Sequence, residues 1–366
     1  MSVHPVRRII SSLGAGKVPA LCGVFLAFSA LCCFPGGNTQ KAPLPKPLSP
    51  PDASITAESG SKAGDFAAFS ADGSSPFPGA GAPPATDPRR AEEVMKALAA
   101  AYPERIDRVE YRDGDWAVSL RAGGPGGTDS QKTAWYYYAG GRLLPEELRS
   151  RAQEFDPQPF YQYPAELAPW QPPGPEQTER FRGQAERRRL HPPKRSQHFY
   201  DALWRSRSRD ESWERVKSLR FLGRPVMVHY MILEELAQVE ERILWEAKTS
   251  PQVRAWINSL DTLDGWNWRS IADTQSRSFH AYGAALDLLP KSLGGRETYW
   301  LWAARRSPEW WAIPYERRLH PPEAVIRAFE AYGFLWGGKW LFFDTMHFEY
   351  RPEILMLNKL PPAHIQ

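Results

Sequence analysis

Two segments decide how this sequence is interpreted: SFHAYGAALDL (278–288) and WGGKWLFFDTMHFEY (336–350). In the first, His280 and Asp287 lie seven residues apart, and Gly283 between them permits a sharp turn. The run AALDLL that contains Asp287 is short and apolar, which is typical of a buried strand. We therefore expect the histidine before the turn and the aspartate on the strand to point into one cleft.

The second segment adds a histidine and another carboxylate. Aromatic residues surround Asp344 and His347, which predicts a strand whose few polar residues occupy specific positions. His280, Asp287 and His347 then form a three-ligand set, which leaves a fourth position for water, as in a catalytic zinc site. Asp344, three residues before His347, is the candidate to accept a proton from that water and pass it to a leaving amine.

Taken singly, each of these residues has a structural interpretation. A histidine in an aromatic segment is usually a hydrogen-bonded core residue, and an aspartate near a strand end usually caps a turn. Four further histidines have no acidic partner in a comparable setting and are interpreted as structural: His191, His198, His229 and His320. Four tryptophans flank the two segments, and core packing is the default for most of them, although one or two are expected to line the cleft: Trp266, Trp268, Trp336 and Trp340.

The combined motifs resemble a known family. Five positions fit the pattern S-x-H-x-x-G-x-A-x-D (Ser278, His280, Gly283, Ala285 and Asp287), and the D-x-x-H of the second segment follows downstream. This pair is similar to the zinc D-alanyl-D-alanine carboxypeptidases of the VanY type, relatives of the bacteriophage L-alanyl-D-glutamate endopeptidases. The resemblance covers about residues 215–355.

The resemblance implies roles for individual residues. It implies that His280, Asp287 and His347 bind one catalytic zinc ion and that Asp344 is the general base and acid, at a position where many members of the family have glutamate.

The family also has an arginine that steadies the substrate carbonyl or carboxylate. Arg269, in NWRSIA, is the nearest match, and Arg277 is the competitor; a guanidinium can bind a carboxylate through two parallel hydrogen bonds. Ser278 is expected either to hydrogen-bond the substrate or a group behind the ligands, or to be a turn residue.

Composition divides the chain. Residues 1–34 contain three basic residues, no acid and an apolar run, which predicts a secretory signal peptide or an N-terminal anchor. All three cysteines lie there, so lipidation at Cys32 or Cys33 is an alternative, and a thiolate metal site is excluded for the rest of the chain. Without this segment the net charge of +4 falls close to zero, which disfavours a nucleic-acid-binding protein.

The remaining chain is expected to form an α+β protein. We expect helices at 91–102, 322–333 and 232–247, the last with apolar residues at helical spacing that include Leu244. Two extended runs around an Asp-Gly predict a hairpin at 108–121, and further strands are expected at 134–145 and 224–231. The predicted organisation is a Pro/Ala/Gly/Ser-rich disordered linker (35–89), a small α+β module (90–155), a Pro/Arg-rich connector (156–198) and a zinc peptidase domain (199–361). The resemblance implies that this last domain has the hedgehog/D,D-peptidase fold, with a small antiparallel sheet and flanking helices.

These observations lead to one functional expectation with two alternatives. The expected protein is an exported zinc metallopeptidase of the periplasm or cell envelope that hydrolyses peptidoglycan stem peptides beside a D-amino acid, with a possible membrane tether at its N-terminus. One alternative is an L-alanyl-D-glutamate-type endopeptidase. The other, of a different class, is a non-catalytic wall-binding module on the same fold.

Overall fold

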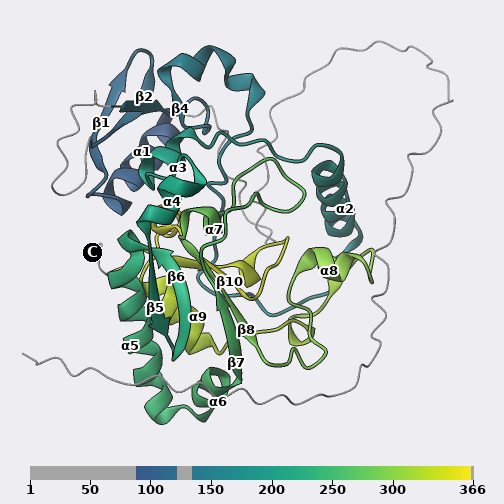
Figure 1. Cartoon of the computed structure of the whole chain (residues 1–366). Helices are drawn as coiled ribbons and strands as arrows, with labels where there is room; N and C mark the ends of the chain where they lie inside the picture. Colours follow the sequence, from purple (N-terminus) through teal and green to yellow (C-terminus); the bar gives the residue numbers. More distant parts are fainter. Residues whose placement is uncertain (1–87, 122–133, 364–366) are drawn as a thin grey trace, which may run out of the picture. The chain divides into compact units, whose positions relative to one another are not determined.

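The computed structural model describes residues 88–121 and 134–363, which contain antiparallel sheets and helices and so agree with the α+β prediction (Figure 1). The predicted signal segment 1–34 and the linker 35–89, apart from its last two residues, lie outside the described residues. Among the helices that the structure describes, none has the length and apolar character needed to cross a bilayer.

The N-terminal part is a four-stranded antiparallel sheet covered by one helix. The strands follow chain order: β1 Ile106–Arg112, β2 Asp115–Leu120, β3 Ala134–Tyr137 and β4 Leu144–Pro145. Asp113 and Gly114 connect β1 to β2 and both have positive φ, as a tight hairpin turn requires. Helix α1, Pro88–Ala101, buries Val94 and Leu98. The hairpin and the helix expected in this region are both present.

The second sheet carries the two decisive segments. Its order is β7 Leu260–Asp264, β8 Ala285–Pro290, β10 His347–Tyr350 and β9 Phe334–Trp336, all antiparallel. Strands β8 and β10 lie side by side in Figure 1. The segment 336–350, expected to be one strand, instead forms the end of β9, a loop that holds Asp344, and then β10. A separate hairpin consists of β5 Val216–Phe221 and β6 Arg224–His229.

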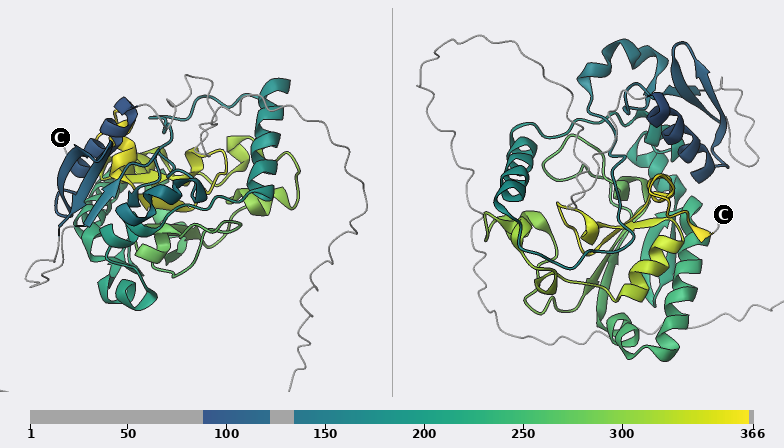
Figure 2. Two further views of the ribbon diagram at one scale, coloured as in Figure 1. Left: turned by 90° about the horizontal axis from the view of Figure 1, so that it is seen from above. Right: turned by 180° about the vertical axis from the view of Figure 1, so that it is seen from behind.

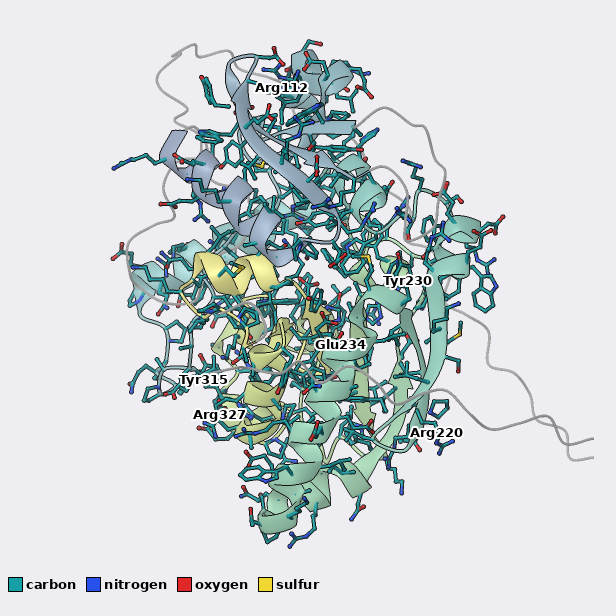
Figure 3. All side chains as sticks on the ribbon, turned by 90° about the vertical axis from the view of Figure 1, so that its left-hand side faces the viewer. Arg112, Arg220, Tyr230, Glu234, Tyr315 and Arg327 are labelled. Atoms are coloured by element: carbon teal, nitrogen blue, oxygen red, sulfur yellow. The ribbon has the colours of Figure 1, made fainter. Side chains whose placement is uncertain are left out.

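Helices pack against the strands. Helix α5, Leu233–Thr249, starts just after Tyr230, which Figure 3 labels together with Glu234 in its first turn. It buries one stripe of residues at helical spacing, among them Leu236, Val239 and Ile243. Leu244, expected on this stripe, is instead 47% exposed. The other helices are α3 His198–Leu203, α4 Arg209–Arg215, α6 Pro251–Ser259, α7 Phe279–Tyr282, α8 Trp300–Ala304, α9 Glu323–Ala331 and α10 Pro352–Leu357.

The N-terminal sheet and the second sheet share one hydrophobic core. A single cluster of buried side chains includes Leu98 of α1, Val118 of β2, Leu236 of α5 and Phe348 of β10. A buried hydrogen bond of 2.8 Å from Tyr102 Oη to Glu353 Oε2 adds a polar link between the end of α1 and α10. The chain from 90 to 155 is therefore packed against the residues that follow it.

The connector contains a helix that the sequence did not predict. Helix α2, Pro175–Leu190, begins with proline at its first turn and ends in three arginines, both favourable for a helix. Its one buried residue is Phe181, so no apolar period reveals it. Phe181 joins a second cluster with Trp300 and Phe343, and α2 lies beside α8 in both views of Figure 2.

His229 is a structural histidine, as expected from the sequence. It is fully buried, its Nε2–H donates to the Trp204 carbonyl at 2.9 Å, and its Nδ1 accepts from Met231 N at 3.2 Å. Both ring nitrogens are used in the neutral form, and burial lowers its pKa to about 3.

This environment makes stability depend on pH. The unfolded chain takes up the proton near pH 6.5, whereas the folded chain does not until about pH 3. Folding stability is therefore lost as pH falls through this window, by up to ~1.4 kcal/mol per unit from this one group. Urea unfolding at pH 6.5 and pH 5 should show a smaller loss in His229→Gln, which keeps an amide donor for Trp204. Equal losses in both proteins would contradict this assignment.

Candidate metal centre

The pairing of β8 with β10 places two of the predicted ligands opposite each other. His347 is the register partner of Asp287, and the next pair is Phe348 with Leu286. Side chains alternate along a strand, so the polar pair faces one side of the sheet and the apolar pair the other. Asp287 and His347 are both buried, with 8% and 7% of their surface exposed.

The third predicted ligand sits on α7, a helix of one turn. Ser278 caps it, because its hydroxyl accepts a hydrogen bond from His280 N at 3.3 Å. Gly283 ends the helix with φ of 70°, and a Cβ there would lie 2.7 Å from His229 N. Glycine is thus required both for the left-handed turn and for the close approach of the hairpin. The sequence expected the turn at Gly283 but not the short helix before it.

The three ligand atoms converge. His280 Nε2 lies 3.2 Å from Asp287 Oδ1 and 3.1 Å from His347 Nδ1, and His347 Nδ1 lies 2.9 Å from Asp287 Oδ1. A tetrahedral site with bonds of ~2.0–2.1 Å has its ligand atoms about 3.3 Å apart. The group is therefore close to the spacing that one zinc ion requires. Within residues 88–121 and 134–363 it is the one group of three such residues that could hold a metal ion.

The remaining ring nitrogens are fixed by partners behind the ligands. His280 Nδ1–H donates to the Gly265 carbonyl at 2.5 Å, and His347 Nε2–H donates to Glu349 Oε2 at 3.2 Å. These bonds leave the lone pairs of His280 Nε2 and His347 Nδ1 directed at the common point. Sequence reasoning missed Glu349, although its spacing of two from His347 on a strand puts both on one face.

The electrostatics suit a cation. Burial disfavours a charged Asp287, yet the adjacent His280 and His347 hold its pKa well below the usual range. Burial likewise opposes a charged His347, but hydrogen bonds to Asp287 and Glu349 raise its pKa to about 10. A metal ion would take the place of this proton, so binding releases protons and strengthens as pH rises.

Asp344 provides a fourth polar group beside the three. Its Oδ1 is buried and has no hydrogen-bond partner among the described residues. Burial and the charge of Asp287 raise its pKa to about 7, while His347 and Arg269 oppose that rise. A Cβ at Gly337 would lie 2.5 Å from the Asp344 carbonyl, so glycine at 337 allows this loop to close. A buried carboxylate oxygen without a partner fits a site that binds a further polar group.

Two of the three ligands, Asp287 and His347, line a cavity of about 530 Å³ together with Asp344. Its other walls include residues that precede the decisive segments in the chain, such as Tyr161 and Gln197. Both candidate arginines also line it. Arg277 donates to Asp201 Oδ1 at 2.7 Å and to the Ser206 carbonyl at 3.0 Å, which fixes its guanidinium. Arg269 is exposed and has no ion-pair partner among the described residues.

The flanking tryptophans divide between core and cavity. Trp336 is 1% exposed and donates to the Thr345 carbonyl at 2.9 Å, so it is a core residue. Trp266 donates to Ser212 Oγ at 2.8 Å, and Trp268 lies beneath the Arg277 guanidinium. Trp340 lines the cavity, with its ring centroid 5.6 Å from that of His347.

Comparison with known protein families agrees with this location. Residues 272–350 match the model of a family described as D-alanyl-D-alanine carboxypeptidase, which supports the metallopeptidase family. All three ligands and Asp344 lie within the match. Residues 94–160 match the model of a domain of unknown function. Neither a curated protein nor a solved structure matches the chain significantly.

Gly265 offers a test of how the ligands are oriented. A Cβ at this residue would lie 2.1 Å from the Met227 carbonyl, so Gly265→Ala must displace the backbone whose carbonyl holds His280. We expect zinc affinity to fall by ~10–100-fold, as for other groups that orient metal ligands. Competition with a chromophoric chelator measures this affinity.

The matched control is Gly183→Ala in α2, where a Cβ meets nothing within 4 Å. This variant should bind zinc as the unaltered protein does. Unchanged affinity in a folded Gly265→Ala protein would contradict the orienting role.

Proposed function

We propose that the protein is an exported zinc metallopeptidase that hydrolyses peptidoglycan stem peptides at an amide bond next to a D-amino acid, in the manner of a D-alanyl-D-alanine carboxypeptidase. The observation that supports this most strongly is the convergence of His280, Asp287 and His347 beside Asp344, whose Oδ1 has no partner among the described residues. The family match over 272–350 supports the same reaction class.

The ligands would hold zinc through His280 Nε2, His347 Nδ1 and the Asp287 carboxylate. Zinc, when bound, lowers the pKa of a water to about 7 and polarises a carbonyl. Asp344 then accepts a proton and later donates it to the leaving amine, and its raised pKa near 7 suits both roles. Arg269, on the wall of the same cavity, binds the carboxylate or the carbonyl oxygen of the substrate. Ser278 contributes by capping α7 and so positioning His280.

The decisive experiment uses purified protein and a peptide ending in D-Ala-D-Ala. We expect release of D-alanine that a chelator abolishes and zinc restores. Mass spectrometry of digested muropeptides identifies the bond. Products shortened by one D-alanine support a carboxypeptidase, whereas split stem peptides would replace it with an endopeptidase. Zinc binding without any hydrolysis would favour the non-catalytic wall-binding module instead.

Asp344→Asn separates proton transfer from metal binding. The amide keeps the size of the side chain but cannot accept a proton, so kcat should fall by ~10²–10⁴-fold while zinc affinity is retained. Asp264→Asn is the matched control, because Asp264 is an exposed carboxylate on the same cavity. A small and equal effect of both substitutions on kcat would exclude Asp344 as general base.

A further inference from the structure

A second cavity of about 250 Å³ shares a wall with the one that Asp287, Asp344 and His347 line. Residues 339–341 line both cavities. Its other sides come from residues 167–177 and from 311–318, the insertion between β8 and β9. No residue that lines it is acidic, and two, Arg318 and Lys339, are basic.

The two basic residues differ in their partners. The charge of Lys339 is paired, because its Nζ lies 2.6 Å from Glu330 Oε1. The same Nζ donates to the Ala165 carbonyl at 2.7 Å. Arg318 is 7% exposed and makes no salt bridge to any described residue. Its guanidinium donates only to backbone carbonyls, those of Ile313 at 3.0 Å and Trp311 at 3.3 Å. Burial lowers its pKa to about 10, so it still carries its charge at neutral pH.

A buried cation without a counter-charge is costly. Aromatic faces compensate for part of this cost, since the guanidinium carbon of Arg318 lies 4.1 Å from the Phe343 ring centroid and 5.2 Å from that of Tyr315. Tyr315 is labelled near the edge of the molecule in Figure 3. An anion that enters the cavity would supply the missing charge.

A second unpartnered group lines the same cavity. Trp311 is only 7% exposed. Its indole Nε1–H has no hydrogen-bond acceptor among the described residues. Buried donors without an acceptor are uncommon and point to a missing partner. The indole rings of Trp170 and Trp340 complete an apolar lining. The cavity thus offers a cation, a hydrogen-bond donor and aromatic walls, which together suit a carboxylate on an apolar body.

We propose that this cavity is a binding site for a carboxylate-bearing ligand. The carboxylate of the ligand pairs with Arg318 and accepts a hydrogen bond from Trp311 Nε1–H, and its apolar part packs against the tryptophan rings. The site stands on its own observations. A stem peptide as the natural source of the carboxylate, bound beside the cavity of the candidate metal ligands, rests on the proposed function.

The test follows the indole N–H signals of the full-length, zinc-loaded protein by NMR, with the Trp311 signal assigned through Trp311→Phe. The probe is N-acetyl-D-alanine, and its neutral amide is the comparison. We expect the carboxylate to move the Trp311 signal saturably and to bind at least about ten-fold more tightly than the amide, as hydrogen bonds to a charged group imply.

Three arginine variants locate the site. Arg318→Gln should weaken binding by about ten-fold or more, whereas Arg317→Gln, an exposed neighbour, should not. Arg269→Gln should leave the Trp311 shift intact, because Arg269 does not line this cavity. If circular dichroism shows that Arg318→Gln is unfolded, saturation-transfer NMR of the probe with Trp311→Phe replaces it, and reduced binding is expected.

Three results would overturn the proposal: no movement of the Trp311 signal, equal binding of acid and amide, or a shift lost in Arg269→Gln but kept in Arg318→Gln. Hydrolysis of the D-Ala-D-Ala peptide in the same samples separates the two claims. A retained shift without hydrolysis would count against the proposed function alone, and hydrolysis without a shift against this inference alone.

Discussion

The register between β8 and β10 is the constraint on which the candidate site depends. It sets Asp287 opposite His347 and thereby brings together two segments sixty residues apart. Because side chains alternate, a slip of one residue would turn His347 to the apolar side of the sheet and put Phe348 in its place. The apolar partners, Phe348 and Leu286, are fully buried and so hold the register that the polar pair needs.

Polar contacts extend from this strand pair into the rest of the molecule. His347 is held by Glu349, Glu349 lies 3.5 Å from Arg351, and Arg351 contacts Glu353 at 2.5 Å. Glu353 in turn accepts from Tyr102, at the end of α1. A buried network of this kind is stable only when its members are all paired. The N-terminal sheet is thus connected to the candidate metal ligands both by a shared core and by a chain of hydrogen bonds and ion pairs.

The sequence predicts much of the fold and the residues of the candidate site. The features that it does not predict have physical causes. The motifs pointed to His280, Asp287, Asp344 and His347, because a histidine or aspartate within an apolar segment indicates a polar group held at a specific position. Helix α2 was missed because a helix with one buried residue has no apolar period. The sequence could not distinguish the two candidate arginines, because only the fold reveals that Asp201, far away in sequence, pairs with Arg277. The second cavity could not be predicted from the sequence either, because segments that are not adjacent in the chain form its walls.

The central claim is that the strand pair and α7 hold a metal ion at one defined point. Anomalous diffraction at the zinc absorption edge, from crystals of the zinc-loaded protein, tests it most directly. We expect one strong peak within ~2.0–2.2 Å of His280 Nε2, His347 Nδ1 and an Asp287 carboxylate oxygen. A peak elsewhere, or zinc held by the opposite nitrogens of these rings, would contradict it.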